Sequence, residues 1–345
     1  MNKKKLLKLS KRYYTIGKPM KNARPSPERY HIYKEFEEYQ KNNYKTIRVK
    51  CLCNNNTSYL ISNVDREGLE YPLMICKSCG LIRAREYWDE KSTDHFYSNW
   101  YRKKYGGEEN PDKFYKQHLF KSKLLWDFVN EYTSKLNKPI NIFDIGGGSG
   151  SILDLFISEN NCYLFDFNKN FLKKANEMGI KTIEGGINKL NLIKEKPDLV
   201  ILSHVLEHFT NVHQELETLI RHLKLGSLVF VELPGIDSLV EGRRAYNFLG
   251  DIQTPHVFYF SLGVLNNLME RHGFKCLKSN TRISALYKYT GETGELVNYH
   301  DTVCSLINIS ERRRKFLLPF IKLKLHRILP ISFKSWVKKQ LPWFK

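Results

Sequence analysis

Residues 140–151 are the stretch of this sequence best suited to bind a nucleoside. An apolar run that carries Asp144 near its end leads into a turn rich in glycine, and apolar residues at helical spacing follow. A strand, a glycine turn and a helix start allow the backbone to approach a ligand closely. Asp166 stands 20 residues after Gly146, at the end of a second apolar run, where an acid can accept both hydroxyls of a ribose. This stretch alone leaves an ordinary tight turn as the alternative.

The glycine spacing distinguishes two kinds of nucleotide-binding loop. The dinucleotide fingerprint G-x-G-x-x-G needs glycine or alanine at position 151, where this chain has Ser151. The observed spacing, Asp144-x-Gly146-x-Gly148-x-Gly150, resembles motif I of the class I S-adenosylmethionine (SAM) methyltransferases. The resemblance implies that this loop holds the methionine end of SAM, with Asp144 toward the ammonium group, and that Asp166 holds the ribose. Phe167 and Ser203 are the other two candidate cofactor-binding residues.

Three later segments resemble the same family in order and spacing. Residues 203–208 read Ser-His-Val-Leu-Glu-His, and residues 223–227 read Leu-Lys-Leu-Gly-Ser before another apolar strand. Residues 255–261 read Pro-His-Val-Phe-Tyr-Phe-Ser. They are similar to the S-H-V-L-E-H, L-K-P-G-G and H-x-x-Y-F-S segments of many bacterial methyltransferases, with Leu225 and Ser227 as departures.

Candidate acid–base residues lie in two of these segments. Methyl transfer requires an aligned acceptor and a group that takes its proton, because a sugar hydroxyl is too weak an acid to react unaided near neutral pH. The resemblance to sugar C-methyltransferases implies that Glu207 and His208 act as base or bind the substrate. His256 and His204 are further catalytic candidates. Alternatively, these side chains only brace the loop and the next helix.

The cysteine spacing indicates a metal site. Cys51-x-Cys53 and Cys76-x-x-Cys79 are separated by 22 residues, and Gly80 follows the second pair. Four thiolates suit a structural zinc ion, since they leave no open position for chemistry. The Cys-x-Cys half departs from the usual pattern, so unligated cysteines are the alternative. The segment resembles the zinc ribbon that precedes the methyltransferase domain in bacterial sugar C-methyltransferases.

The predicted fold class is α/β, a Rossmann-like seven-stranded methyltransferase sheet with a small N-terminal zinc-binding domain and basic helical termini. The strands are expected at 140–145, 161–165, 180–184, 198–202, 228–233, 274–279 and 283–289, the last two as a hairpin. Five regions follow: a basic lead-in (1–45), a zinc-ribbon-like domain (46–90), helices that cover the cofactor pocket (91–138), the methyltransferase domain (139–290) and a basic amphipathic region (291–345).

The charge of the chain predicts an anionic partner. Its 56 Lys and Arg against 36 Asp and Glu give a net charge of +20, which attracts nucleic acid, anionic membrane or phosphorylated substrates. The lead-in is either a solvated terminus or an interfacial helix. The stretch after residue 310 suits an anionic membrane, docking on the chain itself, or RNA. With no transmembrane run or signal peptide, and with cysteines at metal spacing, we expect a cytoplasmic protein that can lie at the inner membrane face.

The expected function is SAM-dependent methylation of a sugar, either a nucleotide sugar or a lipid-linked surface glycan of bacterial polysaccharide biosynthesis, with an acidic or phosphorylated acceptor. An RNA methyltransferase is an alternative. The chain lacks the Asn/Asp-Pro-Pro-aromatic motif of base-amine methylases after the fourth strand, which makes nucleic acid the less favoured partner. A non-catalytic binding protein with the same fold is a third possibility, disfavoured by the intact glycine loop and Asp166.

Overall fold

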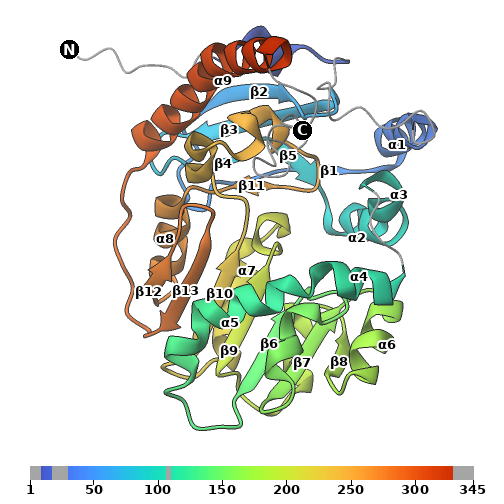
Figure 1. Cartoon of the computed structure of the whole chain (residues 1–345), viewed down its shortest axis with the longest axis vertical. Helices are drawn as coiled ribbons and strands as arrows, with labels where there is room; N and C mark the ends of the chain where they lie inside the picture. The colour runs from blue at the N-terminus through green and yellow to red at the C-terminus, as the bar shows by residue number, and fades with distance from the viewer. Residues whose placement is uncertain (1–8, 18–29, 106–109, 329–345) are drawn as a thin grey trace.

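A computed structural model describes residues 9–17, 30–105 and 110–328 of the chain (Figure 1). A large mixed sheet occupies one end of the molecule and a smaller antiparallel sheet lies toward the other (Figure 1). Residues 1–8 and 329–345, for which the sequence suggested interfacial or docking roles, lie outside the described residues, as do residues 18–29 of the lead-in and residues 106–109.

The large sheet has seven strands in the order β12-β13-β10-β9-β6-β7-β8. Neighbouring strands from β8 to β10 pair in parallel, whereas β13 is antiparallel to both β10 and β12. The strands are β6 (Asn141–Ile145), β7 (Asn161–Asp166), β8 (Lys181–Glu184), β9 (Leu199–Ser203), β10 (Leu228–Glu232), β12 (Phe274–Ser279) and β13 (Ser284–Tyr289). Each agrees within one residue with its predicted range, and the predicted terminal hairpin is confirmed.

Alternate residues of the central strands enter cores on opposite faces of this sheet, as a period of two requires. Ile142 of β6 belongs to one core, while Phe143 and Ile145 belong to the other. The first core is covered by α5 (Phe120–Thr133) and the second by α7 (Val212–His222). Two further helices are α6 (Lys169–Glu177) and α8 (Leu262–Arg271).

The helix expected after the glycine turn is shorter and tighter than its apolar spacing suggested. Residues Ser151–Phe156 form η3, a 3-10 helix, whose buried residues Ile152, Leu153 and Phe156 face the core against α5. Helices of the 3-10 type are usually short, because their hydrogen-bond geometry is poorer than that of an α-helix.

The smaller sheet contains one strand from far along the chain. Its order is β11-β4-β3-β2, with β2 (Ser58–Val64), β3 (Glu70–Cys76), β4 (Ile82–Ala84) and β11 (Phe258–Tyr259). Outside it, β1 (Thr46–Arg48) pairs with β5 (Glu86–Trp88). One continuous core runs from this sheet into one face of the large sheet. The segment 46–90 therefore does not pack as a separate unit.

Helices from both ends of the chain flank the smaller sheet. On one side lie α1 (Tyr30–Asn43), α2 (Glu90–Asn99) and α3 (Tyr101–Tyr105), whose aromatic rings pack against one another. On the other side α9 (His300–Ile328) crosses the end of the molecule beside η1 (Lys11–Tyr14) and packs on η6 (Asp237–Glu241) (Figure 1). The first turns of α9 thus dock on the chain itself.

A buried ion pair joins α3 to the turn between β2 and β3. The Nζ of Lys104, which has no exposed surface, lies 2.9 Å from Oε2 of Glu67 and donates to the hydroxyl of Tyr105. Asp65 is buried in the same cluster, and burial, followed by the charge of Glu67, raises its pKa to about 7. Lys104 is the closer and more deeply buried of two cations that balance these carboxylates, since Nε of Arg66 lies 3.8 Å from Oε1 of Glu67.

We expect Lys104→Met to lower the free energy of unfolding by about 3 kcal/mol, because Glu67 would lose its closest cation and keep only the more distant Arg66. Urea denaturation of the wild type and the variant measures this loss. The double variant Lys104→Met/Glu67→Gln should recover most of it, since no buried charge is left unpaired. A double variant as unstable as the single one would contradict the assigned ion pair.

Candidate functional site

The glycine turn after β6 is shaped by backbone conformations that only glycine adopts cheaply. Gly146, Gly148 and Gly150 have φ values of +72°, +61° and +76°. A Cβ at Gly147 would lie 1.8 Å from Oδ2 of Asp144, so any side chain there would collide with the acid. The turn consequently wraps closely around Asp144.

Asp144 is a buried acid without a partner. Its side chain is fully buried, and neither carboxylate oxygen has a hydrogen-bond partner among the described residues. Burial, and then the charge of Asp166, raise the pKa of Asp144 to about 8. An unpaired buried carboxylate is costly, so this position is suited to a ligand that brings a cation, such as an ammonium group.

Asp166, at the end of β7, fixes the same turn. Its Oδ2 accepts from the backbone N–H of Gly148 at 2.9 Å, and its Oδ1 accepts from that of Asn168 at 2.8 Å. The next side chain, Phe167, is 72% exposed, which is unusual for a phenylalanine. The acid and the exposed ring thus stand together at the edge of the glycine turn.

Helix α4 (Pro111–His118) covers this turn from the segment 91–138. A Cβ added to Gly148 would lie 3.0 Å from the Phe114 ring, which also packs on Phe171 with ring centroids 4.6 Å apart. His118 stacks on the same phenylalanine at 4.1 Å. The glycine turn is therefore enclosed by an aromatic cover as well as by the sheet.

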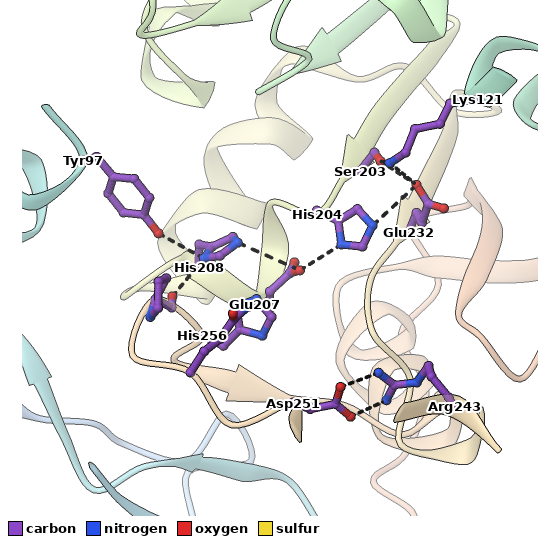
Figure 2. Close-up of polar contacts among 12 residues, drawn as sticks. Tyr97, Lys121, Ser203, His204, Glu207, His208, Glu232, Arg243, Asp251 and His256 are labelled. Atoms are coloured by element: carbon purple, nitrogen blue, oxygen red, sulfur yellow. Dashed lines mark hydrogen bonds and ion pairs between the residues drawn. The ribbon is translucent and has the colours of Figure 1, made fainter. Parts of the chain in front are cut away.

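A polar cluster lies at the carboxyl ends of β9 and β10 (Figure 2). His204 follows β9 with φ +58°, a left-handed conformation that is costly for histidine and common at functional sites. Its Nδ1 lies 3.4 Å from Oε1 of Glu207, and its Nε2 lies 3.9 Å from Oε2 of Glu232 (Figure 2). The imidazole is held between two carboxylates while 45% of its side chain remains exposed.

Glu207 lies beneath this imidazole, inside η5 (Leu206–His208), with 1% of its side chain exposed. Burial alone would raise its pKa, but the neighbouring His204, with His208 and His256, lowers it to about 2. Glu207 is therefore ionised at neutral pH and faces imidazoles rather than solvent.

His208 and His256 sit deeper and are held by other segments. The Nδ1 of His208 lies 2.8 Å from the carbonyl oxygen of Pro255 and 3.0 Å from the hydroxyl of Tyr97 (Figure 2). The backbone carbonyl of His256 accepts from the hydroxyl of Tyr71 at 2.7 Å, and burial lowers the pKa of its imidazole. The structure thus brings all four predicted catalytic residues together but leaves His204 as the most exposed of them.

Three residues of this cluster were not predicted. Glu232 ends β10 and accepts from Ser203 Oγ at 2.6 Å, Lys121 Nζ lies 3.3 Å from the same carboxylate, and Tyr97 contacts His208. A signal existed for Glu232, because an acid that ends a buried parallel strand must lie at the same sheet edge as Ser203. For Lys121 and Tyr97, which come from helices, the sequence held no such signal.

The loop after β10 is anchored below the cluster. Arg243 makes two ion-pair contacts of 2.6 Å to the carboxylate of Asp251 (Figure 2). It also donates to the carbonyl of Gly235 at 2.8 Å. These bonds support a turn in which residues 244–246 all have positive φ. The loop that leads to His256 is thereby fixed at its start.

The four cysteines form one compact group. The Sγ of Cys51 lies 3.5 Å from those of Cys53 and Cys79, and the Sγ of Cys53 lies 3.6 Å from that of Cys76. Sulfurs that bind zinc at about 2.3 Å in a tetrahedron are about 3.8 Å apart, so the group fits a closed metal site. The chain turns directly after the Cys-x-Cys pair at Asn54, whose φ is +62°.

This group is tied to the large sheet by its own backbone. The carbonyl of Leu52 accepts from Arg271 Nη1 at 2.9 Å and lies 2.9 Å from His213 Nε2. A Cβ at Gly80 would lie 2.7 Å from the backbone of Tyr299, so glycine is needed for the chain before α9 to pass. Loss of the cysteine group would therefore loosen α7, α8 and α9 together.

Residues 115–279 match the family model described as a methyltransferase domain. No curated protein matches the sequence. Among solved structures, the chain is similar to the plantazolicin methyltransferase BamL, in complex with a substrate analogue and S-adenosylhomocysteine (SAH), with 17% identity and a TM-score of 0.41 over 70% of this chain and 90% of that one. It is also similar to YcgJ of Bacillus subtilis, with 16% identity and a TM-score of 0.35 over 46% and 70% of the two chains. An O-methyltransferase family protein of Burkholderia thailandensis has 15% identity and a TM-score of 0.39 over 54% and 60%.

We expect the purified protein to contain zinc and Cys79→Ser to lose it and to melt several degrees lower, because a metal held by the four cysteines would join residues 51–53 to residues 76–79. Elemental analysis of the purified protein and a thermal melt measure both effects. Cys162→Ser is the matched control, since Cys162 lies buried in the large sheet and outside the group. Equal zinc content in the two variants would refute the assignment of Cys79 as a ligand.

We expect Asp144→Asn to stabilise the ligand-free protein more at pH 8 than at pH 5. The raised pKa means that the native state keeps a proton that the unfolded chain releases above about pH 4, so wild-type stability falls as the pH rises toward 8. The asparagine variant lacks this loss, which amounts to at most about 5 kcal/mol.

Urea denaturation at the two pH values measures the difference between wild type and variant. The same substitution should weaken SAM binding about tenfold or more in calorimetry, because a charge-assisted hydrogen bond is lost. A variant that binds SAM as tightly as the wild type would show that Asp144 does not face the ammonium group.

Proposed function

We propose, from the premise that residues 115–279 form a SAM-dependent methyltransferase domain, that the acceptor is a sugar and that His204 is the base that takes its proton. The observation that carries the proposal is the position of His204. It is strained, solvent-accessible and flanked by two carboxylates at the carboxyl edge of the sheet, where such folds hold their ligands.

The glycine turn suits the cofactor. The unpartnered Asp144 would take the ammonium group, the backbone of Gly146, Gly148 and Gly150 would lie along the methionine part, and Asp166 would take the ribose. Phe167 offers an exposed ring for the adenine, and Ser203 lies at the end of β9 beside the base. When bound there, SAM supplies an electrophilic methyl group.

The chain's own residues handle the proton. With its Nδ1 3.4 Å from Oε1 of Glu207, His204 would present the lone pair of Nε2 to the acceptor hydroxyl or to an acidic C–H. The proton moves to Nε2 as the acceptor's electron pair forms the new bond. Glu207 and Glu232 then stabilise the imidazolium, as the carboxylate does in a catalytic triad. Glu207, His208 and His256 act as positioning residues, because the first is buried and the histidines are held by Tyr97 and Tyr71.

The acceptor class is supported by the sequence resemblance to sugar C-methyltransferases and by a site lined with imidazole and carboxylate groups, which suits a hydroxyl-bearing molecule. A phosphorylated or acidic acceptor is favoured by the net charge of +20. We assign zinc to the four cysteines as a structural ion, because four thiolates close the coordination sphere.

We expect His204→Asn to lower kcat about 100-fold while leaving SAM binding intact. Asparagine tolerates the left-handed backbone but cannot accept the proton, so the base is lost without distortion of the turn. SAH release with a panel of nucleotide sugars and glycolipids measures turnover, and calorimetry measures SAM binding.

His222→Asn, on the far end of α7, is the matched control and should keep wild-type turnover. Full activity of the His204 variant would show that another residue takes the proton. If SAM binds but none of the sugars in the panel supports SAH release, the acceptor class is overturned and the cofactor assignment stands.

A further inference from the structure

Two segments almost 300 residues apart in sequence meet at one end of the molecule. Helix α9 lies beside η1 (Figure 1), and Oε1 of Glu311 accepts from the hydroxyl of Tyr13 at 2.6 Å and from Nη2 of Arg12 at 2.5 Å. The Tyr13 hydroxyl also accepts from the backbone N–H of Leu249 at 3.1 Å. The buried tyrosine therefore locks η1 onto both α9 and the loop before His256.

The carboxylate of Glu311 is fully engaged in these contacts, whereas several nearby Lys and Arg side chains are exposed. Glu311 is buried, and its second oxygen accepts from Arg314 at 3.2 Å. The exposed cations around it are Lys11, Arg312 and Lys315, together with Arg313, whose guanidinium also donates to the carbonyl of Val240. Glu241 of the adjoining η6 is an exposed acid, so cations outnumber acids on this surface.

Exposed apolar side chains lie among these cations. Ile309, Arg312 and Arg313 share the outward face of α9, since residues three and four apart are neighbours on a helix. Ile309 is 41% exposed on α9, and Ile16, just after η1, is 57% exposed. Tyr14 is exposed next to them in the chain. Cations interleaved with apolar groups are the composition of a surface that rests in a lipid interface.

We propose that the surface formed by η1, residues 14–16 and the outward face of α9 up to Lys315 binds an anionic lipid bilayer. No helix in the described part of the chain is long and apolar enough to span a membrane, so the contact is peripheral. The proposal is independent of the reaction and of the acceptor.

Sequence composition favours lipid over RNA as the occupant. Residues 316–345 contain no Asp or Glu, and their Lys and Arg residues alternate with leucine, isoleucine and phenylalanine. RNA-binding surfaces rely on phosphate contacts and on exposed aromatic rings that stack on bases. Here the most exposed apolar residues of the surface are isoleucines, which cannot stack on bases but can enter a bilayer interface.

Co-sedimentation of the full chain with vesicles tests the proposal. Vesicles of equal parts phosphatidylglycerol and phosphatidylcholine should bind the wild type, and vesicles of phosphatidylcholine alone should not. Arg312→Ala/Lys315→Ala should weaken binding about twentyfold, because each basic side chain near an anionic leaflet strengthens binding roughly fivefold. Lys189→Ala/Lys194→Ala, which removes the same charge beside β8, should bind like the wild type.

The double variant Ile309→Ser/Ile16→Ser distinguishes binding to lipid from binding to other polyanions. It should weaken vesicle binding several-fold at unchanged charge, and it should leave the weak, salt-sensitive attraction to a single-stranded RNA oligonucleotide unaltered. Thermal melts of all variants confirm folding.

Three results would overturn the proposal. These are equal binding of the wild type to both vesicle types, equal losses in the two lysine-containing double variants, or tight RNA binding that depends on Arg312 and Lys315 without vesicle binding.

Discussion

The pairing of β11 with β4 is the interaction on which the site depends. Only two residues of β11 pair, yet they carry the loop of His256 onto a sheet built from residues 58–84. The backbone of Val257 donates to the carbonyl of Glu207 at 2.9 Å and accepts from the N–H of Ala84 at 2.9 Å. A continuous path of backbone hydrogen bonds therefore runs from the cysteine-bearing sheet to the polar cluster. The cysteine-bearing segment therefore helps to position the loop of His256 beside Glu207.

This arrangement explains why the buried and exposed members of the cluster have different roles. From the N-terminal side, Tyr97 contacts the imidazole of His208 and Tyr71 donates to the backbone carbonyl of His256, and the carboxylate of Glu207 is ionised because imidazoles surround it. His204 stands on the large sheet, between that carboxylate and Glu232. Rigid support on one side and solvent access on the other are what a proton acceptor needs.

The large sheet was predictable from the sequence because each of its strands is a short apolar run bounded by turn signals. The hairpin of β12 and β13 was predicted from the resemblance, whereas no order was predicted for the other strands. The role of β11 was not predictable, since two paired residues leave no periodic pattern and their partner lies about 175 residues away. Tyr97, Lys121 and the lock between Tyr13 and Glu311 were missed for the same reason. They are single long-range contacts, and only the three-dimensional packing brings their partners together.

The costly features of the chain are concentrated at the same edge of the large sheet. Asp144 is buried without a partner, both oxygens of Glu207 lack a hydrogen bond among the described residues, and His204 holds a left-handed backbone. Each feature costs about 1–3 kcal/mol, and a sequence selected only for stability would lose them. Elsewhere in the described residues a few neutral groups, such as the hydroxyl of Tyr87, also lack a hydrogen bond, while the buried carboxylate of Glu67 is paired with Lys104. What distinguishes this edge is that two buried carboxylates without a hydrogen bond lie there with an exposed, strained imidazole, a combination that suits the proposed cationic ligand and proton transfer.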